Sequence, residues 1–352
     1  GDKVYQITNT IGTKINLNGV YNREETLPLG NLNYRGDIWM DISGGAFGII
    51  SGGVTNEWST KLQTSTLTGD THVQLSGNAT AEHVIGGNNK GASTTLTGNT
   101  NVTVKDNAIV AGAIIGGSTS AHNAVTTITG NTSVLVTNVQ YSNTAQNLDG
   151  GLSNSYIIGG SSWSSNTTSG TTIQGSTSAT INLNGITLSG TEEHNSFVKT
   201  IIGGSYGNVN NAGTVNNING DTSVSIIGRE GITFTGDIIG GSFENSGQAQ
   251  YTIGGNSSIS ISGGSTFTGN IYGGSYSKVP GNTGSTMTTA GNITVELGTG
   301  TYRGNIYGAG NKGTAGGDVL VSLTGGSVFG AEGEQSGITI GGSAGAAVEG
   351  NR

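Results

Sequence analysis

The chain has 352 residues, of which 66 are glycine, two are proline and none is cysteine, and its formal net charge is −8. Only 32% of the residues are hydrophobic and 10% are charged, a composition that disfavours both a large globular core and a charge-rich disordered chain. The basic residues are scattered, which argues against nucleic acid as a partner because phosphate binding requires clustered Lys and Arg.

Residues 1–35 do not follow the pattern of the rest of the chain. They contain strand-like segments at 4–7 and 15–17, separated by polar residues. Because a solenoid needs an atypical segment at its end, we expect 1–35 to be an N-terminal capping segment and 36–352 to be the repeat domain. An irregular end of a longer domain is the alternative.

The clearest repeat unit is residues 255–275, GNSSISISGGSTFTGNIYGGS. Ile259 and Ile261 alternate with serines, which is the period of a strand with one buried face. Paired glycines at 263–264 permit a tight corner. A second short strand then carries Phe267, and a third strand at 271–272 ends at another Gly-Gly pair. We therefore predict three short strands in each unit and no helix.

This unit recurs along the chain, with successive copies beginning 26 to 45 residues apart. The opening glycines are Gly36, Gly69, Gly98, Gly130, Gly175, Gly220, Gly255, Gly291 and Gly317. The closing corners read I-[IY]-x-G-G or a close variant such as IIGGS or IYGGS, and begin at Ile49, Val84, Ile114, Ile157, Ile201, Ile238, Ile271, Ile306 and Thr339. Repeats of this length with short strands and glycine corners indicate a parallel β-helix. We predict an all-β solenoid of about nine coils, with one repeat in each coil.

Stacking of the coils would align equivalent residues into ladders along the helix. One predicted ladder contains Phe234, Phe267 and Tyr302, each of which lies four residues before a closing isoleucine. The corresponding isoleucines, Ile238, Ile271 and Ile306, should pair with one another. Stacked aromatic rings add roughly 0.5–1.5 kcal/mol per pair beyond the burial of their area.

The residue after each opening glycine is Asp, Asn or Ser, and Asp37 and Asp70 are equivalent positions in neighbouring coils. Their expected separation of ~4.8 Å is similar to the ~5–5.5 Å of a retaining glycosidase pair, and two carboxylates are also a weak candidate for a Ca²⁺ site. Because most other coils have Asn or Ser there, we interpret the column as a turn ladder.

Other motifs give no sign of catalysis. The four histidines show no metal-ligand spacing, and no nucleophile motif is present. A GxGxxG match at 308–313 is followed by residues that cannot begin a helix. We therefore expect no catalytic residues, no metal, no cofactor and no enzyme activity.

Two consecutive repeats carry long insertions, at 137–156 and 184–200. Variable loops on a rigid repeat are where binding tends to reside, and we expect these two to leave the same corner and form one protrusion. Trp163, in the loop 161–170 between the two coils, is either a platform for a ligand or a clamp beneath the insertions. The other candidate binding residues are Tyr141, Tyr156, Phe197 and His194.

The IIGGS and IYGGS corners, the strands GNTSV at 130–134 and GDTSV at 220–224, and the lack of cysteine resemble passenger regions of bacterial autotransporter adhesins over residues 36–352. The resemblance implies a right-handed parallel β-helix on the outside of a Gram-negative-type cell. The protease motif GDSGS of proteolytic autotransporters is absent. We expect the chain to be a piece of a longer protein that is anchored in the outer membrane through another region.

These features predict a non-enzymatic adhesin segment at the bacterial cell surface. Its expected partner is a glycan or protein of a host cell or a neighbouring cell, with self-association as a further mode of contact. The alternative is a glycan-cleaving β-helix enzyme or a domain of the phage tailspike type.

Overall fold

The structure is a computed structural model. It describes residues 1–8, 15–21, 32–55, 64–89, 93–120, 125–139, 156–163, 170–186, 196–197, 199–208, 214–245, 249–278, 286–311, 313–330 and 340–341. Within these ranges all regular elements are β-strands, and the strands pair in parallel between successive coils. The described part of the chain contains no helix of the length and apolarity needed to cross a membrane.

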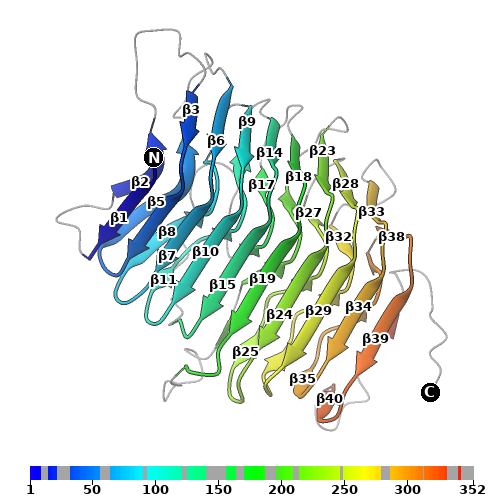
Figure 1. The fold of residues 1–352 in the computed structure, drawn as a ribbon. Coiled ribbons are helices and arrows are strands. Elements are labelled where there is room, and N and C mark those ends of the chain that lie inside the picture. The colour runs from blue at the N-terminus through cyan, green and yellow to red at the C-terminus, as the bar shows by residue number, and fades with distance from the viewer. Residues whose placement is uncertain are drawn as a thin grey trace.

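The chain winds into a stack of coils, so that each sheet collects one strand from each turn (Figure 1). The first sheet, sheet A, contains β1 (Lys3–Ile7), β4 (Ile38–Ile42), β7 (Thr71–Leu75), β10 (Thr100–Lys105), β15 (Thr132–Thr137), β19 (Thr177–Asn182), β24 (Thr222–Ile227), β29 (Ser257–Ser262), β34 (Ile293–Leu297) and β39 (Val319–Leu323).

Sheet B contains β2 (Ile15–Tyr21), β5 (Ala46–Thr55), β8 (Thr80–Ile85), β12 (Ile114–Ile115), β16 (Tyr156–Ile158), β21 (Thr200–Ile202), β26 (Ile238–Ile239), β31 (Ile271–Tyr272), β36 (Ile306–Tyr307) and β41 (Ile340–Gly341), with β11 (Ile109–Val110) also paired to β8. Sheet C contains β3 (Leu32–Arg35), β6 (Ser65–Thr68), β9 (Thr94–Thr97), β14 (Val125–Ile128), β18 (Gly170–Ile173), β23 (Val215–Ile218), β28 (Gln250–Ile253), β33 (Thr286–Thr289) and β38 (Gly313–Ala315).

Two smaller sheets occupy corners of the coil. Sheet D contains β13 (Thr119–Ser120), β17 (Ser162–Trp163), β22 (Tyr206–Gly207), β27 (Phe243–Glu244), β32 (Ser275–Ser277) and β37 (Gly310–Asn311). Sheet E contains β20 (Ser196–Phe197), β25 (Thr233–Phe234), β30 (Thr266–Phe267), β35 (Gly300–Tyr302) and β40 (Ser327–Phe329). A full coil therefore passes through sheets C, A, E, B and D in turn.

The predicted parallel β-helix is confirmed, and sheet A has ten strands where about nine coils were expected. The additional turn comes from residues 1–35. Their strands β1, β2 and β3 pair with β4, β5 and β6, and so cover the first repeat by continuing its three large sheets.

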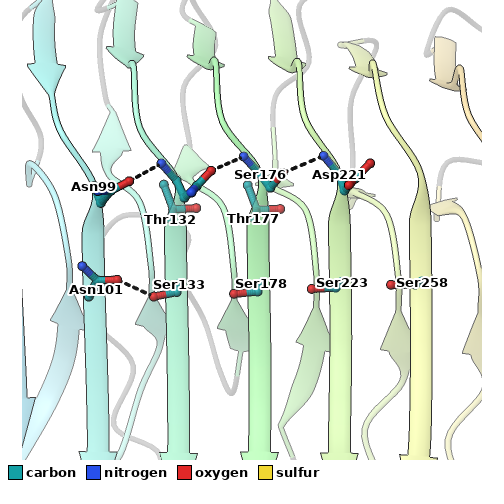
Figure 2. Close-up of a pocket in the computed structure, with 11 residues that line it drawn as sticks. Asn99, Asn101, Thr132, Ser133, Ser176, Thr177, Ser178, Asp221, Ser223 and Ser258 are labelled. Atoms are coloured by element: carbon teal, nitrogen blue, oxygen red, sulfur yellow. Dashed lines mark hydrogen bonds between the residues drawn. The ribbon is translucent and has the colours of Figure 1, made fainter.

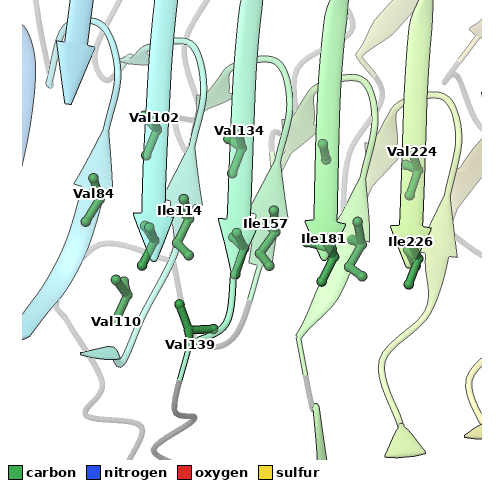
Figure 3. Close-up of a cluster of buried hydrophobic side chains, with 14 of the residues drawn as sticks. Val84, Val102, Val110, Ile114, Val134, Val139, Ile157, Ile181, Val224 and Ile226 are labelled. Atoms are coloured by element: carbon green, nitrogen blue, oxygen red, sulfur yellow. The ribbon is translucent and has the colours of Figure 1, made fainter. Parts of the chain in front are cut away.

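The core lies between the inward faces of sheets A, B and C and runs the length of the stack. Figure 3 shows a central part of it, between sheets A and B. Strands of sheet A alternate buried and exposed side chains, as in β4, where positions 38, 40 and 42 are buried. Val102, Val134 and Val224 occupy one inward column of sheet A and face isoleucines such as Ile114 and Ile157 of sheet B. Burying each such side chain contributes about 1.5–3 kcal/mol, so a few apolar residues in each coil are sufficient.

The predicted aromatic ladder is also confirmed. The rings of Phe234 and Phe267 stack with centroids 4.9 Å apart, and Phe267 and Tyr302 are 5.2 Å apart. Phe197 and Phe329 extend the ladder at either end. The three isoleucines that follow this ladder pair in register, as predicted.

The register differs from the prediction at two closing corners. Val84 pairs with Ile50 and not with Ile49, and Ile306 pairs with Ile340 and not with Thr339. A shift of one residue moves a side chain to the opposite face of a strand. Accordingly, Ile50 is fully buried in the core, whereas Ile49 packs on the outside of sheet B.

Sheets C and D were not predicted as strands. Sheet C comes from the short polar runs before each opening glycine, in which a single apolar residue, such as Leu67, Leu96 or Ile128, points into the core. In β6, β9 and β14 the four-residue runs contain two or three threonines and one buried apolar side chain each, which is a weak periodic signal. Sheet D has strands of only two or three residues.

Candidate binding surface

The outward face of sheet A is a regular surface built from ten strands. The side chains at alternate strand positions form two columns that run along the stack. The first column contains Val4, Trp39, His72, Asn101, Ser133, Ser178, Ser223, Ser258, Thr294 and Leu320. The second contains Gln6, Asp41, Gln74, Thr103, Leu135, Thr180, Ser225, Ser260, Glu296 and Ser322.

A ladder of hydrogen bonds borders this face where the chain enters sheet A from the opening glycines. In each step the side chain of one coil accepts a hydrogen bond from the backbone N–H of the equivalent residue in the next coil. The Oδ1 atom of Asn131, for example, accepts from the N–H of Ser176, and the Oγ atom of Ser176 accepts from the N–H of Asp221, at 2.8 and 3.0 Å (Figure 2). The members are Asp2, Asp37, Asp70, Asn99, Asn131, Ser176, Asp221, Asn256, Asn292 and Asp318.

Asp37 and Asp70 are neighbours in this ladder, as their spacing predicted. The Oδ1 atom of Asp37 accepts the N–H of Asp70 at 2.8 Å, and the Oδ1 atom of Asp70 accepts the N–H of Asn99 at 2.7 Å. Each carboxylate thus satisfies a backbone donor in the same way as the Asn and Ser residues of other coils. Among the described residues no group of three or more His, Asp or Glu side chains is arranged to hold a metal ion.

A polar hollow of about 540 Å³ lies between the ladder and the first outward column (Figure 2). Small side chains produce it, because the first-column serines of four consecutive coils leave space that longer side chains would fill. Hydroxyl and amide groups line the hollow, and the Oγ atom of Ser133 donates to the Oδ1 atom of Asn101 at 2.8 Å. Its lining residues are Asn99, Asn101, Asn131, Thr132, Ser133, Ser176, Thr177, Ser178, Asp221, Ser223 and Ser258.

A second hollow of about 540 Å³ adjoins the first, and Asn101 lines both. This one is more apolar because it contains the indole of Trp39 and the imidazole of His72. The two rings stack with centroids 3.7 Å apart and planes 11° from parallel. Asp41 and Gln74 stand beside them in the second column, where the Nε2 atom of Gln74 donates to the Oδ1 atom of Asp41 at 2.9 Å.

The candidate residues named from the sequence do not gather at one place in the described fold. Tyr141 and His194 lie outside the described residues. Trp163 is described only by its backbone in β17, which pairs with β13 and β22. Phe197 belongs to the buried aromatic ladder, with 3% of its surface exposed, and so is not on a binding surface.

Tyr156 lies on the outside of sheet B, in a second aromatic cluster with residues of sheet D. Its ring is 4.5 Å from that of Tyr206 and 6.2 Å from that of Phe243. Burial raises the pKa of Tyr156, the hydrogen bond with Tyr206 lowers it, and the carboxylate of Asp237 raises it further. In this cluster, side chains of sheet D pack against the outer face of sheet B, and Tyr156 contributes to that packing.

The two insertions leave adjacent coils at the same corner, as predicted. The ends of β15 and β19 pair at Thr137 and Asn182, and their returns into sheet B pair at Tyr156 and Thr200. The bases of the insertions are joined where the Oδ1 atom of Asn138 accepts the N–H of Gly185 at 2.9 Å. The interiors of both insertions, and with them the predicted protrusion, lie outside the described residues.

Searches against protein-family models, curated proteins and solved structures find no match to this chain. A functional assignment therefore depends on the residues and on their arrangement. The sequence reasoning missed Trp39 and His72, although each lies three positions after an opening glycine, as Asn101 does. Aligning the units on those glycines would have placed all three in one column.

Proposed function

We propose that this chain is part of a non-enzymatic bacterial adhesin, related in style to autotransporter passenger regions, and that it acts outside the cell. In this proposal the stacked coils form a rigid support that presents a binding face to a glycan or protein of another cell. Contact between copies of the chain is a second mode of adhesion.

The observation that carries the proposal is the outward face of sheet A, with its two hollows joined at Asn101. Ligand sites combine a concave surface with a few fixed polar groups. Here the polar groups are held by strands whose backbone is paired on both sides, so little ordering is needed when a ligand binds.

The proposal is tested by measuring whether the purified chain binds to glycan arrays and to whole host and bacterial cells. Binding to at least one such surface that saturates with protein concentration is the expected result. A matched control is the chain unfolded by heat and applied at the same concentration. Absence of saturable binding to every glycan and cell surface would contradict the proposal.

The alternative, a glycan-cleaving enzyme, has Asp37 and Asp70 as its candidate residues. Both carboxylates accept backbone hydrogen bonds within the ladder, which is a structural role shared with coils that have Asn or Ser. New reducing ends released from a polysaccharide, and lost in the Asp70→Asn variant, would establish the enzyme and overturn the adhesin.

A further inference from the structure

We propose that the hollow beside Trp39 is a binding site for one residue of an uncharged saccharide. The inference deepens the proposed adhesin function and rests on it, because it names the class of ligand and its place on the binding face. Its elements are the open face of the Trp39 indole and the polar side chains of the second outward column.

The stack with His72 determines which face of the indole is available. Since the rings are 3.7 Å apart and nearly parallel, the imidazole on β7 covers one face of Trp39. The opposite face is directed along the sheet towards β1, where the paired residue is Val4. Valine is too small to cover an indole, and both side chains are exposed, by 67% for Val4 and 46% for Trp39. The change from Val4 to Trp39 therefore forms a step in the face of the sheet.

His72 is itself held in place from the other side. The Nδ2 atom of Asn101 lies 3.5 Å from the Nδ1 atom of His72, and Ser133 in turn donates to Asn101. This row of contacts keeps the imidazole, and therefore Trp39, in one orientation. A rigid aromatic ring loses little entropy on binding.

The polar groups suit a sugar. Gln6, Asp41 and Gln74 stand two residues further along the same three strands. The carboxylate of Asp41 accepts from Gln74 through Oδ1, and no described residue donates to its Oδ2. A saccharide stacked on the indole through its C–H face would have its hydroxyls beside this carboxylate and the amide groups, which can accept and donate hydrogen bonds.

Charge and surface shape favour an uncharged saccharide over an acidic saccharide or a protein. Asp41 is the only carboxylate that lines the hollow among the described residues, and the chain carries a net charge of −8, so an anionic sugar would be repelled. A protein interface usually needs about 800 Å² on each side with an apolar centre. From Ser133 to Thr294 the first column consists of small polar residues, which suits further sugar units and not an apolar protein core.

The test is isothermal titration calorimetry, which measures the affinity of the whole chain for uncharged oligosaccharides that end in glucose, galactose, mannose or N-acetylglucosamine. We expect at least one to bind. Trp39→Ala should weaken that binding by at least about tenfold. Val4→Trp should weaken it similarly, because the new ring would cover the open indole face while Trp39 is retained. Leu320→Ala, at the same column of the last strand and 55% exposed, is the matched control and should change the affinity less than twofold.

The outcomes separate this inference from the function on which it rests. Saccharide binding that is unchanged in both Trp39→Ala and Val4→Trp overturns the site, as does binding to cells without binding to any uncharged saccharide. If Trp39→Ala abolishes binding only to protein-coated surfaces, the pocket docks a protein and the saccharide is excluded. Should Trp39→Ala fail to fold by circular dichroism, Val4→Trp decides, because it removes no contact. Lack of binding to every glycan and cell contradicts the adhesin itself.

Discussion

The ammonium group of Lys199 donates hydrogen bonds to the backbone carbonyls of Ala111 and Gly112, which lie two coils away in the stack. Only 1% of the lysine surface is exposed. Burial therefore lowers its pKa to about 7, from an ordinary value of 10.5, because removal from water disfavours the charged form. Because burial disfavours only the charged form, this lysine makes the stability of the folded chain depend on pH.

We predict that the free energy of unfolding rises between pH 7 and pH 9.5. In this window the folded chain has released the Lys199 proton, whereas the unfolded chain still binds it. The unfolded state therefore holds more protons, and the stability gained is up to about 1.4 kcal/mol per pH unit. Urea unfolding at several pH values measures the slope, and Lys199→Met should flatten it.

The pH range in that experiment is limited by tyrosines. Burial raises the pKa values of Tyr206, Tyr272 and Tyr302 above the ordinary value of 10.0. Above about pH 10 the unfolded tyrosines lose their protons first, so that stability falls with pH. An equal slope below pH 9.5 in the Lys199→Met variant and the parent chain would show that the lysine is not responsible.

A second prediction concerns the aromatic ladder. Phe267 is 1% exposed and stacks on a ring in each adjacent coil, so Phe267→Ala should cost about 3–5 kcal/mol by leaving a cavity at two coil interfaces. Phe267→Leu should cost less, because it retains most of the volume. The surface control Leu135→Ala, which removes a 37% exposed side chain, should stay within about 0.5 kcal/mol. Similar losses for all three in denaturant titrations would contradict the role of stacking.

A third prediction compares buried and exposed hydrogen-bond ladders. The serines of the IIGGS corners form a buried ladder, in which the Oγ atom of Ser205 accepts the N–H of Ser161 at 3.1 Å. Ser205→Ala leaves that donor buried without this acceptor and should cost about 1–3 kcal/mol. Ser176→Ala removes the corresponding acceptor for Asp221 in the outer ladder, where water can replace it, and should cost less. Thermal and urea unfolding of the two variants in parallel provide the comparison.

A fourth prediction concerns the opening glycines. Gly98 has φ of +149°, and a Cβ atom there would lie 2.3 Å from the carbonyl oxygen of Gly69 in the preceding coil. Gly98→Ala should therefore separate two coils locally and reduce stability by more than about 1 kcal/mol. Gly325 does not have a φ in the left-handed region, and no atom lies within 4 Å of a Cβ added there, so Gly325→Ala is the control and should be nearly neutral. Equal melting temperatures for both variants would contradict this account.

The ladders were the most predictable part of the fold. Phe234, Phe267 and Tyr302 could be aligned because each precedes a distinctive closing corner by the same number of residues. The same counting failed at Ile49, because the corner there reads IISGG with one extra residue before the glycines. Only the pairing with β8 reveals that Ile50 is the residue that faces the core.

The binding face was harder to predict because it depends on contacts between coils. Trp39, as a single aromatic residue in a strand, carries no periodic signal, and His72 was considered only as a metal ligand. Their stacking follows from the register of β4 and β7. The candidates placed in the insertions were chosen because loops often bind ligands, and that argument cannot distinguish Tyr156, which packs on sheet D, from a surface residue.

The outer ladder has a consequence for how such a chain can change in length. At each position of the ladder between its two end members, the side chain accepts a hydrogen bond from the next coil and the N–H donates one to the preceding coil, whether the residue is Asp, Asn or Ser. Removal of residues 221–255 would join Gly220 to Asn256. The N–H of Asn256 would then donate its hydrogen bond to the Oγ atom of Ser176, in place of the N–H of Asp221. The side chain of Asn256 would still accept a hydrogen bond from the N–H of Asn292. Whole coils are thus interchangeable modules. The stack can gain or lose length in steps of one coil while both of its ends stay the same.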